Sequence, residues 1–222
     1  MWSDEFNGDS LNRADWNVET HEKGWVNNEL QEYVDSAENI QVKDGKLIIN
    51  PVKKVTDGDT GSTKEAVSYT SGRVSTQNKQ TFIYGRFECR AKVPKGQGYL
   101  PAFWLMANDE NVYGQWPRCG EIDCMEVMGQ ETNKTYGTIH YGNPHSQSQG
   151  TYTITDGADF SDDFHIFTCD WEPGKITWYV DGVKYHEESD WHSTTVGQGT
   201  LSIANHETCN CSTGNFHICR FM

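Results

Sequence analysis

The chain has 222 residues, a common size for one all-β domain and long enough to bury a sizeable core. Its 18 Lys and Arg residues are outnumbered by 32 Asp and Glu, so the formal net charge is −14. This acidic balance argues against nucleic acid or an anionic membrane as partner and is compatible with a neutral substrate. The sequence holds neither a membrane-spanning apolar stretch nor a signal peptide.

In the first half of the chain, turn residues and alternating polarity predict short antiparallel strands. Residues 40–49 place Asp44-Gly45 between two apolar runs, which is typical of a tight hairpin. The polar stretch from Thr56 to Thr63 is predicted to be a loop. From Arg86 to Val93, apolar and charged residues alternate with a period of two, which indicates a half-buried strand.

The second half of the chain follows the same pattern. Residues 165–171 and 175–180 flank Glu172-Pro173-Gly174 and predict another hairpin, after which Asp181-Gly182 turns the chain again. No segment shows a long apolar stripe with the 3.6-residue period of a helix. Short strands, frequent turns and no helices predict an antiparallel sandwich or barrel, without a linker that would divide the chain.

Three carboxylates stand close together in the otherwise apolar run 120–126, Gly-Glu-Ile-Asp-Cys-Met-Glu. On a strand, Glu121 and Asp123 share a face, whereas Glu126 would point the other way. One extra residue accommodated as a β-bulge, most simply at Met125, returns Glu126 to that face. The two glutamate Cα atoms would then lie roughly 13 Å apart. Their carboxyls could approach the roughly 5–5.5 Å separation of a retaining glycosidase.

A retaining glycosidase needs one ionised carboxylate as nucleophile and a second carboxyl that acts first as acid and then as base. Asp123, between the two glutamates, can hydrogen-bond the nucleophile and help to keep the two glutamate pKa values apart. The alternative is an exposed strand face that carries ordinary solvated acids, since Asp and Glu are common surface residues.

The residues around this strand strongly resemble the catalytic strand of glycoside hydrolase family 16. The match runs from Trp116 to Glu126, and its E-x-D-x-x-E spacing is similar to the laminarinase-type branch rather than to licheninases. Further blocks that resemble this branch follow in order over about residues 2–198, which makes the match far more specific than one motif. They are Trp2–Gly8, Asn27–Gln31, Tyr69–Arg73, Tyr84–Lys92, Pro101–Trp104, Thr138–Gly142 and Trp178–Gly182.

The resemblance implies an all-β fold, an antiparallel β-jelly-roll sandwich of the concanavalin A type with a concave substrate cleft. It also implies retaining endo-hydrolysis of β-1,3-glucan and, in some members, of mixed-linkage β-1,3-1,4-glucan. By position, Glu121 would be the nucleophile, Glu126 the acid/base and Asp123 the assisting acid. The residues implied to bind sugar are Trp104 and Trp116 by stacking, and Asn28, Arg73 and His140 by hydrogen bonds.

Each implied sugar-binding residue also has an ordinary structural explanation. A strand Trp is more often part of the core than a platform for a sugar ring. His140 could be a structural histidine, and Arg73 could belong to a surface ion pair. The motif match favours the functional explanation for Trp116 and His140, and favours it less for Asn28.

The resemblance ends near Gly199, because the Pro- and Phe-rich segment and the last strands of the family have no counterpart. We therefore predict a catalytic domain over residues 1–198 and a divergent or truncated tail over residues 199–222. The missing central strands would leave partner strands unpaired and core faces exposed.

The resemblance implies no cofactor for catalysis, but it does imply a structural Ca²⁺. The ion would be held by Glu5, the backbone carbonyl of Gly45 and an aspartate of the last strand, for which this chain has no counterpart. Seven cysteines leave at least one thiol unpaired, and their spacing is not that of a disulfide scaffold. The run of His206, Cys209, Cys211, His217 and Cys219 could hold a metal, although it matches no standard ligand spacing.

Three other functions compete with an endo-β-glucanase. One is a non-catalytic β-glucan-binding module, which typically lacks one or both glutamates that this chain retains. The second is another specificity, such as licheninase, agarase or carrageenase, and the third is an inactive product of a broken gene. The expected partner is a β-glucan, with no nucleic acid and no membrane, and the expected form is a secreted monomer from which the signal peptide is missing.

Overall fold

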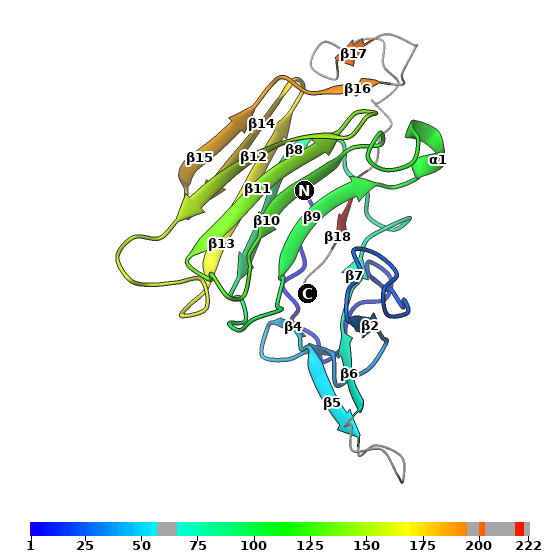
Figure 1. The fold of residues 1–222 in the computed structure, drawn as a ribbon, viewed down its shortest axis with the longest axis vertical. Coiled ribbons are helices and arrows are strands. Elements are labelled where there is room, and N and C mark those ends of the chain that lie inside the picture. The colour runs from blue at the N-terminus through cyan, green and yellow to red at the C-terminus, as the bar shows by residue number, and fades with distance from the viewer. Residues whose placement is uncertain (57–65, 195–199, 203–215, 220–222) are drawn as a thin grey trace. The chain divides into compact units, whose positions relative to one another are not determined.

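A computed structural model describes residues 1–56, 66–194, 200–202 and 216–219 (Figure 1). The chain forms two compact units, one over Met1–Lys79 and one from Gln80 onward, and each is described by itself. The predicted loop after Thr56, and His206, Cys209 and Cys211 of the candidate metal motif, lie outside the described residues. No helix in the described ranges is long and apolar enough to cross a membrane.

The first unit consists of short strands joined by turns. Its strands are β1 Asn17–Val18, β2 Gln31–Tyr33, β3 Ile40–Val42, β4 Leu47–Ile49, β5 Val52–Thr56, β6 Ala66–Ser71 and β7 Val74–Ser75. Strand β6 pairs in parallel with β2 and antiparallel with β5. The predicted hairpin at residues 40–49 is confirmed as β3 and β4. Asp44 and Gly45 both have positive φ, 52° and 68°, as a two-residue type I′ turn requires.

The second unit is a sandwich of two antiparallel sheets. Its elements are β8 Gly85–Ala91, β9 Ala102–Ala107, α1 Glu110–Tyr113, β10 Glu121–Glu126, β11 Lys134–Tyr141, β12 Ser146–Thr153, β13 His165–Glu172, β14 Lys175–Val180, β15 Val183–Glu188, β16 His192–Thr194, β17 Thr200–Ser202 and β18 Phe216–Cys219. One sheet has the order β18-β9-β10-β11-β12, and the other has the order β15-β14-β13-β8. The predicted strand from Arg86 and the hairpin at residues 165–180 are thereby confirmed as β8 and as β13 with β14.

The expectation of a chain without helices is wrong at one place. The four-residue helix α1 follows Asp109, whose side chain accepts a hydrogen bond of 2.9 Å from the backbone N–H of Asn111. Aspartate is a favoured N-cap because it satisfies an otherwise unpaired amide of the first turn. One turn is too short to produce the apolar period that identifies a helix in a sequence.

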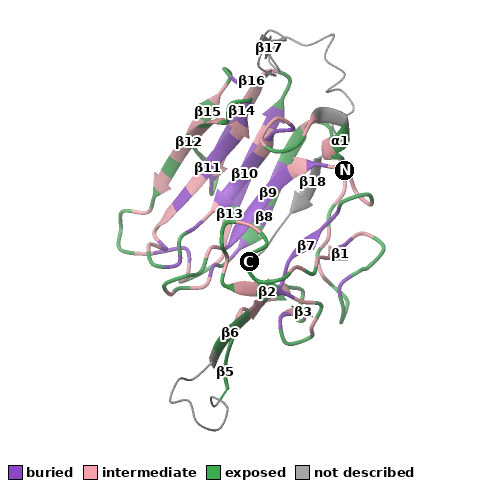
Figure 2. Cartoon of the chain, turned by 45° about the vertical axis from the view of Figure 1, so that its right-hand side comes forward, coloured by how far each residue is buried: buried purple, intermediate pink, exposed green. Residues whose placement is uncertain are grey.

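The two sheets of the second unit pack face to face through large apolar side chains. Trp178 on β14 is fully buried, and its indole N–H donates a 2.8 Å hydrogen bond to the backbone carbonyl of Asp123 on β10. Gly137 on β11 makes room for this ring, because a Cβ there would lie 2.5 Å from Trp178 and 2.4 Å from the hydroxyl of Tyr185. Figure 2 shows the buried residues concentrated on the central strands. Strand β10, which carries the carboxylates, is therefore held against the opposite sheet by Trp178.

The expectation that the missing strands of the family leave their partners unpaired does not hold for β9. Strand β18 pairs antiparallel with β9, from Phe216 opposite Ala107 to Cys219 opposite Trp104. Aromatic and β-branched residues in the sequence Phe-His-Ile-Cys suit an extended strand even without the motif of the family. Strand β18 of the tail thus pairs with β9 on the side that faces away from β10. The boundary at residues 198/199 stays a prediction.

Candidate active site

A β-bulge in β10 brings the three carboxylates to one face of the sheet. Against β9, Glu121 lies opposite Met106 and Glu126 lies opposite Ala102, so five residue steps on β10 span four on β9. The register shifts between Asp123 and Met125 against β9, and between Asp123 and Glu126 against β11. The predicted bulge is confirmed, but the residue without a partner on β9 is Cys124 rather than Met125.

Residues opposite the carboxylates on the neighbouring strands share their face of the sheet. On β9 these are Ala102, Trp104 and Met106, and on β11 they are Tyr136, Thr138 and His140. Strand β12 continues the face with Gln147, Gln149 and Thr151, and the amide of Gln149 donates 2.9 Å to the hydroxyl of Thr138. Carboxylates, a histidine, hydroxyls and amides thus line one surface, together with the aromatic rings of Trp104 and Tyr136.

Glu121 is bound by an aromatic residue of the preceding loop. The indole N–H of Trp116 donates a 2.6 Å hydrogen bond to Glu121 Oε2. Burial and, after it, the negative charge of Asp123 raise the pKa of Glu121 to about 8, while His140 and the Trp116 N–H act in the opposite direction. A buried carboxyl with a strongly shifted pKa and a specific charged neighbour is characteristic of functional sites.

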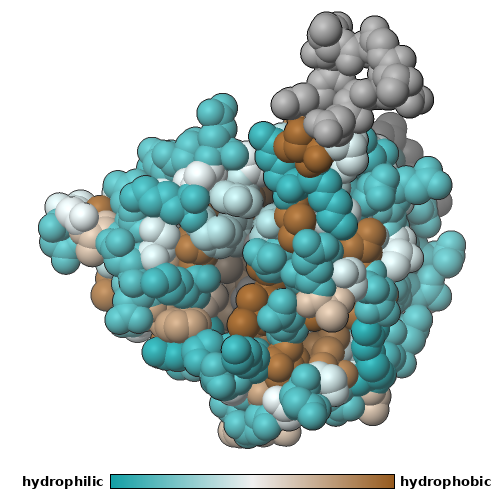
Figure 3. Space-filling view, turned by 90° about the horizontal axis from the view of Figure 1, so that it is seen from below, coloured by the Kyte–Doolittle hydropathy of each residue, from teal (hydrophilic) through white to brown (hydrophobic). Residues whose placement is uncertain are grey.

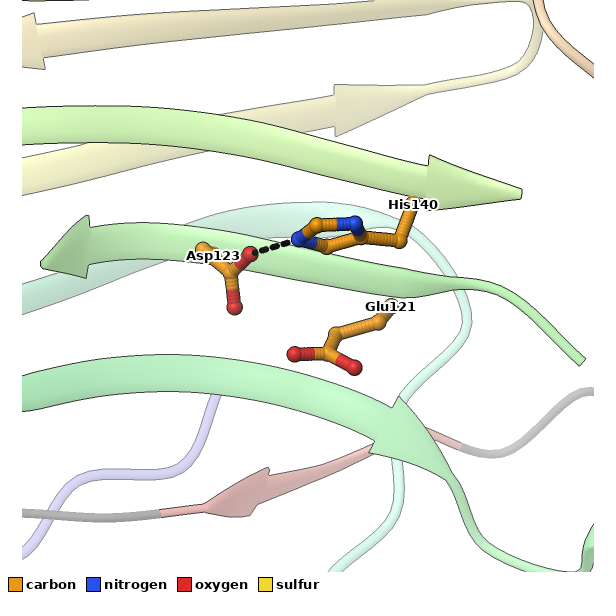
Figure 4. Close-up of side chains that lie close together, drawn as sticks. All are labelled: Glu121, Asp123 and His140. Carbon is orange, nitrogen blue, oxygen red and sulfur yellow. Dashed lines mark ion pairs between the residues drawn. The ribbon is translucent and has the colours of Figure 1, made fainter. Parts of the chain in front are cut away.

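Asp123 and His140 form an ion pair beside Glu121 (Figure 4). Asp123 is only 2% exposed, and its Oδ2 lies 3.2 Å from Nε2 of His140. One ligand atom from each of Glu121, Asp123 and His140 lies within 4.8 Å of the others. Two carboxylates this close share protons, so that protonation of one favours ionisation of the other.

His140 also contacts a histidine that the sequence analysis did not identify. His145, in the turn between β11 and β12, places its Nε2 3.0 Å from Nδ1 of His140. The rings of His140 and His145 stack with centroids 5.2 Å apart, and the ring of Trp116 lies 5.0 Å from that of His145. A residue that follows His140 by five positions across a hairpin turn is close in space, and this spacing could have revealed it.

The two tryptophans implied to bind sugar differ in exposure. Trp116 is 44% exposed beside Glu121, so its ring is accessible to a ligand. Trp104, opposite Asp123 on β9, is only 8% exposed and packs with Ala102 and Met106. Sugar stacking requires an accessible ring face. Trp116 is therefore exposed enough to stack on a sugar ring, while Trp104 is largely buried.

Arg73 and Asn28 belong to the first unit and are described within it. The side chain of Arg73 is buried and bonds the carboxylate of Glu19 through Nε. Its guanidinium carbon lies 5.0 Å from the ring centre of Trp25, a cation–π distance. Asn28 is exposed and has a positive φ of 53°. Arg73 is thus held by Glu19 and Trp25, and Asn28 presents its amide to solvent.

The residues implied to hold Ca²⁺ do not make up a complete site. Glu5 and Gly45 are neighbours, since a Cβ on Gly45 would lie 3.9 Å from the backbone carbonyl oxygen of Glu5. Ca²⁺ takes about six to eight oxygen ligands, usually with several carboxylates. Among the described residues, the acidic or imidazole cluster that could hold a metal is Glu121, Asp123 and His140, while a calcium site at Glu5 and the carbonyl of Gly45 stays a prediction.

Replacing Trp116 by Phe tests the hydrogen bond to Glu121. Phe keeps the ring but lacks the indole N–H, so the pKa of Glu121 should rise and the ionised form should become scarcer. We expect kcat to fall about tenfold at neutral pH, because a hydrogen bond to a charged group contributes about 1.5–3 kcal/mol. The ratio of the two rates on a soluble β-glucan at pH 7 and pH 9 measures the effect. A rate loss that is equal at both pH values would assign Trp116 to sugar stacking alone.

Comparisons with known proteins identify the family. Residues 27–202 match the model of glycosyl hydrolases family 16. The chain is 43% identical over 192 residues to a glucan endo-1,3-β-glucosidase of Cryptopygus antarcticus, covering 85% of this chain and 68% of that protein. It is 39% identical over 207 residues to glucan endo-1,3-β-glucosidase A1 of Niallia circulans, covering 87% of this chain but only 30% of that protein.

A solved structure shares the fold as well as the sequence. The laminarinase catalytic domain from Thermotoga maritima superposes with a TM-score of 0.77 at 35% identity, covering 99% of this chain and 84% of that one. This likeness confirms the predicted jelly-roll sandwich. Together with the family match over residues 27–202, it shows that the chain belongs to glycosyl hydrolases family 16.

Proposed function

We propose that the protein is an endo-acting, retaining β-glucanase that hydrolyses β-1,3-glucan and, as a second activity, mixed-linkage β-1,3-1,4-glucan. The observation that carries the proposal is the bulged strand β10, which gathers Glu121, Asp123 and Glu126 on one face beside the open ring of Trp116. The relatives named for endo-1,3-β-glucosidase activity support the substrate class.

The proposed reaction has two steps at the anomeric carbon C1. Glu126, as the acid, donates its proton to the glycosidic oxygen while the bond from C1 to that oxygen breaks. The Glu121 carboxylate attacks C1 from the opposite face and forms a covalent glycosyl–enzyme. Water then attacks C1 and gives a proton to the Glu126 carboxylate, and the bond to Glu121 breaks. Two inversions at C1 restore the β-configuration.

The surroundings of Glu121 support its role as the nucleophile. It must be ionised to attack, and because its pKa is about 8 the reaction depends on neighbours that stabilise the ionised form. The N–H of Trp116 at 2.6 Å stabilises the anion. Asp123 beside it takes part in holding one proton between the two carboxyls, and His140 binds Asp123.

Two features favour this function over its alternatives. A non-catalytic glucan-binding module has no need of both glutamates or of a partly buried carboxyl with a strongly raised pKa. The E-x-D-x-x-E spacing and its bulge disfavour a licheninase, and the residues Asn27-Asn28-Glu29 favour laminarin over sulfated galactans. A folded two-sheet unit with β18 in place argues against a broken product.

The proposed partner is a neutral β-glucan, met by a secreted monomer that uses no cofactor in catalysis. The formal charge of −14 disfavours nucleic acid as a partner, and hydrophilic side chains cover most of the face in Figure 3. Sugar binding would rest on hydrogen bonds from side chains such as Gln147 and Gln149, and on stacking against Trp116.

A panel of four polysaccharides tests the substrate class. We expect reducing ends to be released fastest from laminarin, more slowly from barley β-glucan and lichenan, and not from agarose. Chromatography should show a ladder of internal fragments at early times, because an endo-acting enzyme cuts within the chain. Release from agarose alone, or only glucose at the earliest times, would contradict the proposal. An inactive protein that still binds laminarin would favour the non-catalytic binding module.

A further inference from the structure

The strongest feature without an assigned role is the carboxylate of Glu110, which binds the loop that carries Trp116. This loop joins β9 to β10 and contains the one-turn helix α1. Oε2 of Glu110, the first residue of α1, accepts a 3.1 Å hydrogen bond from the backbone N–H of Trp116. The indole N–H of Trp116 donates to Oε2 of Glu121 at 2.6 Å. Trp116 is thus bound at its backbone by one glutamate and at its ring by another.

Burial does not account for the position of the Trp116 ring. The residue is 44% exposed. The rings of His140 and His145 lie 6.0 Å and 5.0 Å from it and are tilted by 50° and 40° rather than stacked. A side chain on a surface loop keeps several conformations open unless hydrogen bonds or packing select one of them. The position of this ring therefore depends strongly on how its backbone is held.

The backbone of Glu110 is itself fixed by α1. The helix begins after Asp109, whose side chain accepts a 2.9 Å hydrogen bond from the N–H of Asn111. It ends where the N–H of Gly114 donates a 2.7 Å hydrogen bond to the backbone carbonyl of Glu110. The side chain of Arg118 packs against this end, since a Cβ on Gly114 would lie 3.2 Å from its guanidinium. The Glu110 carboxylate is therefore an acceptor on an anchored backbone.

The backbone hydrogen bonds within residues 115–120 are local. This segment forms two successive turns, the first of which is closed by a 3.0 Å hydrogen bond from the N–H of Arg118 to the carbonyl of Gln115. Such bonds shape the segment but do not fix its place relative to α1. The hydrogen bond between Trp116 and Glu110 joins positions six residues apart. It ties the segment to α1 at the residue that carries the ring.

We propose that Glu110 is a positioning residue for the glucanase reaction, one that sets the place of Trp116 by accepting its backbone N–H. The inference rests on the proposed function and deepens it, because Trp116 contacts the nucleophile and is exposed to the sugar. With its backbone held by Glu110, Trp116 keeps its indole N–H on Oε2 of Glu121 and its ring where a sugar can stack. Without that bond, both contacts weaken together.

Two variants of Glu110 separate the hydrogen bond from the charge. Glu110→Ala removes the acceptor, whereas Glu110→Gln keeps a side-chain carbonyl oxygen that can accept the same N–H without a charge. For Glu110→Ala we expect kcat/KM on laminarin to fall about fivefold, through a lower kcat and a higher KM together. Gln should restore most of it. Glu187→Ala, on β15 where Glu187 pairs with Lys184, makes the same substitution at an exposed position of the other sheet and should change neither constant.

A double-mutant cycle shows whether Glu110 acts through Trp116. In a Trp116→Ala background there is no ring to place, so adding Glu110→Ala should change kcat/KM by less than about twofold. An equal loss in both backgrounds would overturn the inference, because Glu110 would then act independently of Trp116. A Glu110→Gln variant as impaired as Glu110→Ala would also overturn it, because the role would then belong to the charge.

The indole N–H resonance of Trp116 provides a readout that needs no substrate. Among the signals of the 8 tryptophans, it is the one absent from Trp116→Phe. Its proton should shift upfield in Glu110→Ala, because the hydrogen bond to Glu121 weakens, and should stay in place in Glu110→Gln. An unchanged resonance in Glu110→Ala would contradict the inference. If the protein hydrolyses no glucan, the proposed function fails, but the resonance still decides whether Glu110 places the ring of Trp116.

Discussion

Replacing Glu121 by Ala or Gln is expected to lower kcat on laminarin by about 10⁴-fold or more, because the covalent step loses its nucleophile. Such a loss corresponds to about 5 kcal/mol of transition-state stabilisation. Glu126→Ala should be similarly impaired on laminarin, but much less so on an aryl β-glucoside of laminaribiose. An aryl leaving group is a weak base and departs without a proton from Glu126.

Azide distinguishes the two glutamates, because it can replace either the nucleophile or the water. In Glu121→Ala it should occupy the space of the lost carboxylate and attack C1 once, giving an α-glycosyl azide. In Glu126→Ala it should attack the covalent glycosyl–enzyme on Glu121 and give a β-glycosyl azide. The anomeric configuration is read from the proton coupling at C1 by NMR. The opposite assignment of products would exchange the two roles.

The melting temperature of Glu121→Gln shows whether this variant is folded. The pKa of Glu121 is raised to about 8 in the folded protein, above the value of about 4.3 in an unfolded chain. Between these pH values the native state binds more protons, so the contribution of Glu121 to wild-type stability is greatest below about pH 4.3 and is lost as pH rises toward 8. Gln cannot ionise and escapes this loss. We expect its Tm to exceed that of the wild type at pH 8 and to approach it at pH 4.

Local patterns were sufficient to predict β3, β4, β8, β13 and β14. Asp44-Gly45 fixes a hairpin because only a few residue types adopt positive φ at both central positions. The alternation from Arg86 works because β8 has one face in the core and one in solvent. Strand β18 was missed because it was judged by its lack of a family motif, and its pairing with β9 joins segments more than a hundred residues apart. Long-range pairing of this kind leaves no local signal.

The active site was predictable where its residues lie on one strand. The spacing of Glu121, Asp123 and Glu126 required one extra residue, and the structure provides it as a bulge at Cys124. Contacts between elements were not predictable in the same way. The indole N–H of Trp116 reaches Glu121 from a loop, and His145 reaches His140 across a turn. Which atom of a side chain points at which neighbour depends on loop geometry, which residue spacing does not determine.

Replacing Asp123 by Asn is expected to change the pH dependence of the reaction as well as its rate. The kcat/KM of the wild type should fall below about pH 8 as Glu121 becomes protonated, since kcat/KM reports groups of the free enzyme. Asn removes the negative charge that raises the pKa of Glu121 and can donate a hydrogen bond to its carboxylate. The acid limb should therefore move to lower pH by about one unit or more.

The maximum rate of Asp123→Asn should nevertheless fall about 10²-fold, because His140 loses its charged partner and Glu121 becomes less basic. Relative to its own maximum, the variant should retain more activity at pH 5.5 than the wild type does. Glu172→Gln makes the same change in net charge at an exposed turn, where Glu172 pairs with Lys175, and should not move the limb. An acid limb that stays in place in Asp123→Asn, or moves to higher pH, would show that burial alone sets the pKa of Glu121. Asp123 would then act only by orienting His140.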